Sequence, residues 1–170
     1  MNIACMIPAR IGSQRVKLKN LRLINGKPLI SYIIETAIQS KGFDDIYINS
    51  DSLIFEEIAE EYGVKFYKRP EVYATNSASN DDFALDFLLK IECDTLIQLL
   101  PTSPFITVDE INQFIKHMID NKLDTLVSTT DVQIESIYKG QPINFEIMKH
   151  TPPSQSLEPI KAYACGIMGW

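Results

Sequence analysis

The stretch IACMIPARIGSQRVKLKN, residues 3–20, predicts both the kind of sheet in this protein and the place where a ligand binds. Residues 3–7 form a nearly continuous apolar run, which is typical of a strand buried on both faces. A turn follows in which Gly12 and Ser13 let the backbone bend tightly and direct N–H groups outward. Ligands of open α/β sheets bind at the carboxyl ends of the strands, so we expect a ligand at this turn.

Positive charge is concentrated in the same part of the chain. The sequence has 170 residues, a net charge of -6 and 16 Lys and Arg residues. Six of these precede the first acidic residue, Glu35, namely Arg10, Arg15, Lys17, Lys19, Arg22 and Lys27. A basic segment in an otherwise acidic protein is typical of a polyphosphate site. The glycine patterns GxGxxG and GxxxxGK[ST] are absent, which argues against a plain dehydrogenase or a P-loop kinase.

Apolar runs alternate with helical patterns as far as residue 128. We expect strands at residues 3–7, 46–49, 64–67, 95–100 and 126–128. The first helix is expected to start at Pro28 and stop at Gly42, and the second to start with Asp51 or Ser52 as its cap and stop at Gly63. The third is expected to start with Asn80 as its cap, and the fourth with a capping box of Thr107 and Glu110. Parallel strands need helical crossovers, so this order predicts an α/β fold of three layers, with a mostly parallel sheet between helices.

Residues 131–160 show no helical periodicity and contain four prolines. The sequence leaves two interpretations open for this segment: irregular surface structure, or a flap or dimerisation segment. His150, within it, is a weaker candidate for contact with a ligand.

Composition excludes several classes of function. The excess of acidic residues argues against general affinity for nucleic acid or an anionic membrane. No apolar run approaches the length of a membrane span, and no signal-peptide pattern is visible. Cys5, Cys93 and Cys165 are widely spaced and follow no metal-ligand pattern, so we interpret them as reduced core thiols of a cytoplasmic protein.

The segment ARIGSQRVKLKN, residues 9–20, resembles the signature loop of the cytidylyltransferases that activate acylneuraminic acid and related nonulosonic acids. Further matches follow in order: NGKPLISYIIETA at 25–37, RPEVYATNSASNDD at 69–82, PTSP at 101–104 and SQSLEPIKAYACG at 154–166. The resemblance implies one nucleotidyltransferase-like domain over residues 1–170, with a Rossmann-like sheet of the nucleotide-diphospho-sugar transferase type. It also implies transfer of CMP from CTP to a sialic-acid-like sugar acid, with release of pyrophosphate. The alternative is a non-catalytic nucleotide-binding or scaffold domain derived from that family.

The resemblance assigns roles to individual residues. It implies that Arg10 and Lys19 face the triphosphate and act in catalysis. The residues implied to bind the nucleotide are Ala9, Arg10, Gly12, Ser13, Gln14, Arg15, Lys19, Asn20, Arg69, Ala78, Ser79 and Asn80. Those expected to contact the sugar acid are Gln98, Leu100, Thr102 and Ser103. Two of these positions depart from the family pattern: Gln14 stands where a lysine is frequent, and Leu100 stands where a glutamine is thought to contact the sugar.

The resemblance also implies Mg²⁺ and a homodimer. The family's metal-binding aspartates form a DxD-like motif beyond the equivalent of Trp170, and this sequence contains no DxD. The metal ligands therefore stay unknown, with Asp51 as the best remaining carboxylate. We expect a family member that lacks the C-terminal part, binds nucleotide and turns over poorly.

Overall fold

The computed structural model describes residues 1–147 and 153–170, without the side chains of residues 164 and 165, and the chain divides into two compact units. The core unit comprises Met1–Leu126 with Gly166–Trp170, and the second unit comprises Val127–Cys165. His150 and the side chain of Cys165, both singled out in the sequence, lie outside the described part. Cys5 is buried and Cys93 is partly buried, and both are reduced.

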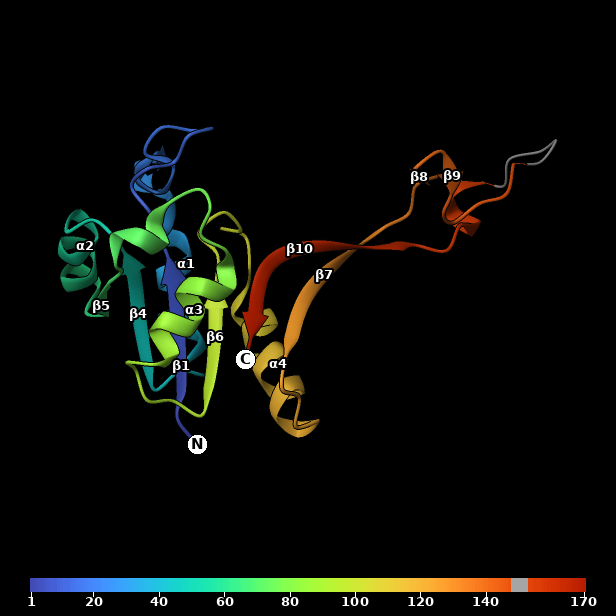
Figure 1. Ribbon diagram of the computed structural model, residues 1–170. Coiled ribbons are helices and arrows are strands. Elements are labelled where there is room, and N and C mark those ends of the chain that lie inside the picture. The colour runs from blue at the N-terminus through green and yellow to red at the C-terminus, as the bar shows by residue number, and fades with distance from the viewer. Residues whose placement is uncertain (148–152) are drawn as a thin grey trace. The chain divides into compact units, whose positions relative to one another are not determined.

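The sheet of the core unit is built on four parallel strands. Their order is β5 (Lys65–Lys68), β4 (Asp45–Ser50), β1 (Ile3–Pro8) and β6 (Thr95–Leu99), as Figure 1 shows. Two more strands extend the sheet beyond β6, namely β10 (Ile160–Gly169) and β7 (Leu126–Val132). The parallel pairing of these four strands confirms the expected mostly parallel sheet.

Strand β10 was not predicted, and it makes the sheet mixed. It runs antiparallel to β6, with Ile167 opposite Leu99 and Gly169 opposite Ile97. Its sequence, IKAYACGIMG, contains two glycines and two alanines and lacks the long apolar run that indicated the parallel strands. Its place depends on a partner about 70 residues away in the chain, and a local pattern cannot reveal such a pairing.

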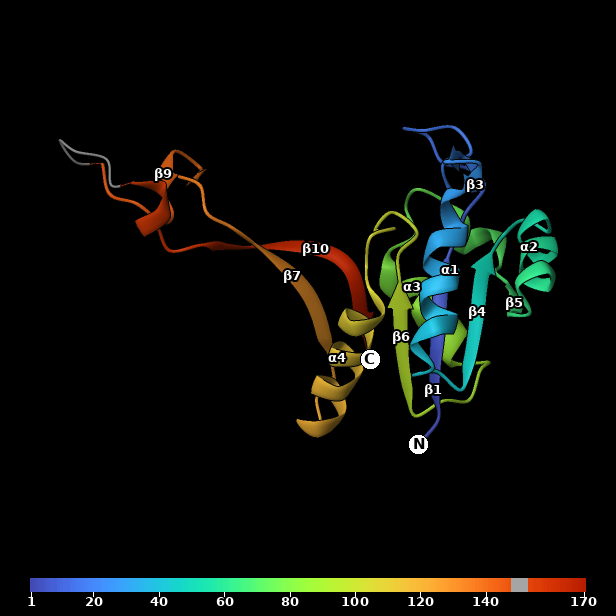
Figure 2. The same cartoon turned by 180° about the vertical axis from the view of Figure 1, so that it is seen from behind.

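Helices cover both faces of the parallel strands. Alternate residues of β1 point to opposite faces: Ile3, Cys5 and Ile7 pack in one apolar cluster, whereas Ala4 and Met6 pack in another. The first cluster takes in α1 (Leu29–Ser40), α2 (Ile54–Tyr62) and α4 (Val108–Asp120), and the second takes in α3 (Asn80–Leu88). Figures 1 and 2 show α3 and α1 on opposite sides of the sheet. The expected three layers are therefore confirmed.

The helix ends follow the sequence in part. The capping box of Thr107 and Glu110 at α4 is confirmed, and Gly63 ends α2 in the left-handed conformation with φ 66°. Two expected caps were wrong. Ser79 rather than Asn80 caps α3, and α2 begins after Leu53 with no side-chain cap. The expected stop of α1 at Gly42 was also late, because Lys41 already leaves the helix at φ 53°.

Short elements complete the core unit and the second unit. The core unit also contains η1 (Lys19–Leu21), β2 (Leu23–Ile24), β3 (Lys27–Pro28) and η2 (Glu71–Ala74). The second unit contains a hairpin of β8 (Ile137–Tyr138) and β9 (Gln141–Pro142), followed by η3 (Ser154–Ser156). Side-chain amides organise this unit internally, since Asn144 donates to the carbonyl groups of Ile134 and Glu158. Among the described residues, no helix is long and apolar enough to cross a membrane.

Candidate functional site

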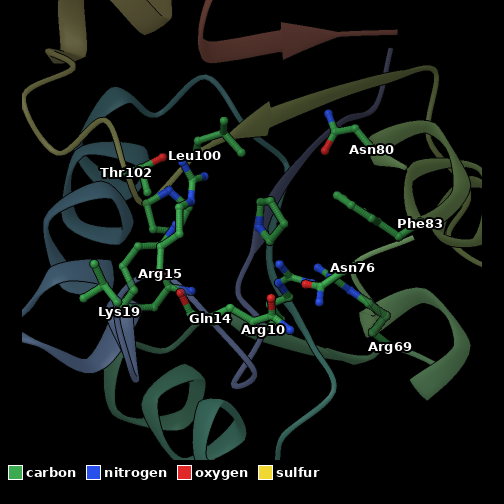
Figure 3. Close-up of a pocket in the computed structure, with 15 residues that line it drawn as sticks. Arg10, Gln14, Arg15, Lys19, Arg69, Asn76, Asn80, Phe83, Leu100 and Thr102 are labelled. Atoms are coloured by element: carbon green, nitrogen blue, oxygen red, sulfur yellow. The ribbon is translucent and has the colours of Figure 1, made fainter. Parts of the chain in front are cut away.

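A pocket of about 760 Å³ lies at the carboxyl ends of the parallel strands in the core unit (Figure 3). Pro8 ends β1, Arg69 follows β5 and Leu100 follows β6, so the ends of three of the four parallel strands contribute to its walls. The residues that line it are Pro8, Arg10, Ser13, Gln14, Arg15, Val16, Lys19, Asn20, Arg69, Asn76, Asn80, Phe83, Leu100, Pro101 and Thr102. The pocket therefore lies where the topology of an open α/β sheet favours ligand binding.

The basic loop, residues 9–20, supplies one cationic side of the pocket. Arg10, Arg15 and Lys19 all line it, and Figure 3 shows Arg15 and Lys19 together on the side away from Arg69. Partial burial lowers the pKa of Lys19, and the positive charges of Arg15 and Arg10 lower it further. Cations held close enough to repel one another favour a polyanionic ligand, because such a ligand relieves the repulsion.

The end of β4 anchors this loop. The Ala9 N–H donates to the Asn49 carbonyl group over 3.0 Å, and the Ile11 N–H donates to Asp51 Oδ1 over 3.1 Å. Asp51 thus holds the loop, which explains why it does not cap α2 as the sequence had suggested. At its outer side, Arg10 Nη1 donates to the Thr75 carbonyl group over 2.8 Å. These contacts tie down the start of the loop, and Gly12, which follows them, lies in open space, with no heavy atom within 4 Å of an added Cβ.

Arg69 forms the opposite side of the pocket. Its side chain is only 3% exposed, and its Nε and Nη2 atoms donate to Asn49 Oδ1 and the Asn49 carbonyl group over 2.6 and 2.8 Å. The guanidinium carbon lies 4.2 Å from the centre of the Phe83 ring. Burial lowers the pKa of Arg69 to about 10, so the group remains a cation at neutral pH. A flat cation with a fixed orientation suits a phosphate or the edge of a nucleobase.

The start of α3 supplies polar groups between Arg69 and β6. Asn80 lines the pocket, and its Oδ1 accepts a hydrogen bond of 3.1 Å from the fully buried Gln98. Gln98 therefore supports Asn80 from below and does not itself line the pocket. Ser79 is engaged in the capping box with Asp82, and neither it nor Ala78 is among the lining residues.

The turn after β6 forms an apolar part of the wall. Leu100, Pro101 and Thr102 line the pocket, whereas Ser103 lies behind them, where its Oγ is 3.4 Å from the Cβ position of Gly166. The side chain of Leu100 offers no hydrogen bond, so Thr102 carries the side-chain polarity of this turn.

Most of the predicted nucleotide residues therefore meet in one pocket, although they come from three separate segments. Ala9 and Gly12 are the exceptions in the basic loop: neither lines the pocket, and Ala9 is buried and touches the sheet through its main chain. Sequence reasoning missed Asn49, Asn76 and Phe83. Phe83 follows the apolar period of α3 and so looked like a core residue, and Asn49 ends an ordinary buried strand. The polar composition of residues 69–79 indicated a loop at the site, but it did not single out Asn76.

Metal ligands are not gathered in the described part of the chain. Within residues 1–147 and 153–170 there is no group of three or more His, Cys, Asp or Glu side chains that could hold a metal ion. The carboxylate of Asp51, the best candidate in the sequence, accepts the N–H of Ile11.

Known proteins resemble this chain over most of its length. The sequence profile of a cytidylyltransferase family matches residues 4–146. The chain is 39% identical over 132 residues to the N-acylneuraminate cytidylyltransferase of Escherichia coli O18:K1:H7, covering 75% of this chain and 31% of the relative. It is 33% identical over 142 residues to the CMP-N,N'-diacetyllegionaminic acid synthase of Legionella pneumophila, covering 79% of this chain and 60% of the relative. The chain thus spans between about a third and three fifths of the length of these relatives.

A solved structure shares the fold over the whole chain. It is a CMP:2-keto-3-deoxy-manno-octonic acid synthetase complexed with CTP, with a TM-score of 0.71 and 22% identity, covering 100% of this chain and 74% of that protein. At this identity the likeness concerns the fold alone.

Proposed function

Because the chain belongs to the cytidylyltransferase family, we propose that its pocket binds CTP and serves the transfer of CMP to a sialic-acid-like sugar acid. One observation carries this proposal: three cations of the basic loop face the same pocket as the buried guanidinium of Arg69. A triphosphate joined to a flat, polar base matches these two sides in charge and shape.

In the proposed reaction, the anomeric hydroxyl oxygen of the sugar acid attacks the α-phosphorus of CTP. A new bond between that oxygen and phosphorus forms as the hydroxyl proton is lost to water, the bond from the phosphorus to the oxygen shared with the β-phosphate breaks, and pyrophosphate leaves. The sugar acid and the triphosphate are both anions, so the protein must offset their repulsion and align the attack. Arg10 and Lys19 are assigned this role, with Arg15 beside them.

The cytidine and the sugar acid are assigned to the remaining walls. Arg69 uses two of its five N–H groups on Asn49 within the described structure, so its Nη1 edge is available to the base or ribose together with Asn80. The sugar acid is assigned to the side of Leu100 and Thr102. Because Leu100 is apolar, we propose that the part of the sugar acid next to it is apolar as well.

Magnesium is expected from the family, and the described residues alone form no cluster of side chains that would hold it. Mg²⁺ prefers carboxylate oxygens in near-octahedral arrangement, and no suitable cluster of side chains occurs in residues 1–147 or 153–170. No step of the proposal is therefore routed through the metal. A homodimer and a cytoplasmic location are further proposals.

The experiment is a titration of the chain with CTP, UTP and ATP, followed by an assay of pyrophosphate release with a panel of nonulosonic acids. The proposal expects tightest binding for CTP, and pyrophosphate release that needs both CTP and a sugar acid. Equal affinity for all three nucleotides would contradict the proposed CTP site. Selective CTP binding with no pyrophosphate release from any acid, with or without Mg²⁺, would instead support the alternative of a non-catalytic nucleotide-binding domain.

A further inference from the structure

One residue in the structure contacts both sides of the pocket without lining it. Asn49, near the end of β4, is fully buried. Its carbonyl group accepts the N–H of Ala9, where the basic loop begins, and also accepts Nη2 of Arg69. Its side-chain oxygen accepts Nε of Arg69 over 2.6 Å. The two parts of the pocket that carry the positive charge are therefore held by the same residue.

The side chain of Asn49 meets Arg69 in surroundings that make the contact strong. The arginine is 3% exposed and the asparagine is 0% exposed, so water competes little for either group. A hydrogen bond to a charged donor contributes more than a neutral one, and an unpaired buried cation is costly. Burial already lowers the pKa of Arg69, which shows that desolvation of this cation is incompletely offset.

The contacts around Arg69 also fix the direction of its guanidinium plane. Asn49 engages the Nε and Nη2 edge, and the Phe83 ring lies 4.2 Å from the guanidinium carbon. With one edge and one face occupied, the Nη1 edge is the part left to address a ligand. An arginine has several rotatable bonds, and a ligand that had to order them would lose affinity.

We propose that Asn49 is a positioning residue for nucleotide binding: its side-chain amide orients Arg69 toward the nucleoside while its carbonyl group sets the start of the basic loop. This role rests on the proposed CTP site. The amide oxygen acts through Arg69, the amide nitrogen donates to Met6 Sδ over 3.1 Å, and the carbonyl group would remain in any side-chain variant. The contribution of the side chain can therefore be isolated by substitution.

The test compares five single variants, Arg69→Ala among them, and one double variant by CTP calorimetry, with thermal unfolding as the check that each is folded. Asn49→Ala removes the acceptor for Arg69 Nε, and Asn49→Ser is a second truncation, whose shorter side chain also withdraws the acceptor, in case the first variant unfolds. Asn49→Asp keeps an acceptor oxygen at the same distance along the side chain. Ile48→Val is the matched control, since Ile48 is the preceding residue, is equally buried and faces the other side of the sheet.

We expect Asn49→Ala or Asn49→Ser to weaken CTP binding about tenfold, Asn49→Asp to stay within about threefold of wild type, and Ile48→Val to bind CTP as wild type does. In an Arg69→Ala background, Asn49→Ala should change the affinity less than about twofold, because the group through which it acts is gone. Unchanged affinity in the folded Asn49 truncations would overturn the role. An equal loss in the Arg69→Ala background, or a similar loss in Ile48→Val, would show instead a general effect of core damage. If wild type itself does not bind CTP, the proposed function falls first, and this role falls with it.

Discussion

At the scale of single residues, the pocket depends on cations whose pKa values the surroundings have lowered. Partial burial and the neighbouring Arg15 and Arg10 lower the pKa of Lys19, and burial lowers the pKa of Arg69 to about 10. Both groups are charged at neutral pH, yet both lose their proton at a lower pH than they would in water. Nucleotide binding should therefore respond to pH on the alkaline side.

Lys19 gives the sharper prediction. A lysine with a lowered pKa loses its charge before the ordinary value of about 10.4 is reached, so CTP affinity should fall as pH rises toward that value. In a Lys19→Arg variant the charge persists, and the fall should be smaller; titrations of both proteins from neutral pH upward measure the difference. Arg69 titrates in both proteins and cancels in the comparison. Identical pH dependence of the two proteins would contradict a charged role for Lys19.

The sequence predicted these cations better than it predicted the residues that hold the cations of the pocket in place. Arg10, Arg15 and Lys19 stand out because positive charge without nearby acids is visible in the chain itself. Asn49 and Phe83 carry no such signal. Asn49 is a polar residue at the end of a strand, and Phe83 follows a helical period that normally indicates core packing. Their part in the site depends on contacts with Arg69, from a distant position in the chain, and those contacts appear only in the folded structure.

At the scale of elements, features that depend on a local sequence pattern could be predicted, whereas a strand that depends on long-range pairing could not. The capping box of α4 and the parallel strands could be predicted because each depends on a short, periodic pattern. Strand β10 could not, because its place between β6 and β7 depends on its fit to distant partners. Gly169 shows how close that fit is, since a Cβ added there would lie 2.6 Å from Met118 Sδ and 3.0 Å from Ile97 Cδ1.

Gly169→Ala should therefore destabilise the core unit. The added methyl group must displace core side chains, and overpacking of this kind costs about 1–3 kcal/mol in the free energy of unfolding. Gly12→Ala is the matched control, because a Cβ there meets no heavy atom within 4 Å. Urea unfolding of the three proteins measures the effect. Equal stability of Gly169→Ala and wild type would show that β10 does not pack against β6 as described.

At the scale of the whole molecule, the second unit exposes several large apolar side chains. Ile134, Ile137, Tyr138 and Ile143 are each between 57% and 64% exposed. Clustered apolar exposure of this kind is typical of surfaces that bind another protein chain. We propose that a second copy of this chain binds to the segment after residue 130.

Light scattering should then give a mass near twice the chain mass of 19.3 kDa. Ile137→Asp should shift the mass toward the monomer, because a charge would be buried at the contact. Leu53→Asp is the matched control, since Leu53 is 59% exposed but lies in the core unit; it should leave the dimer intact. A monomer at every wild-type concentration would refute the dimer.

The central claim is that the basic loop binds the triphosphate of CTP, and calorimetry with CTP tests it most directly. Lys19→Ala and Arg10→Ala should each weaken binding by about 1.5–3 kcal/mol, as for the loss of a hydrogen bond to a charged group. Lys65→Ala is the control, because it removes the same charge from an exposed lysine that pairs with Asp45 over 2.7 Å and does not line the pocket. We expect Lys65→Ala to bind CTP as wild type does. Unchanged affinity in both loop variants, or an equal loss in Lys65→Ala, would contradict the claim.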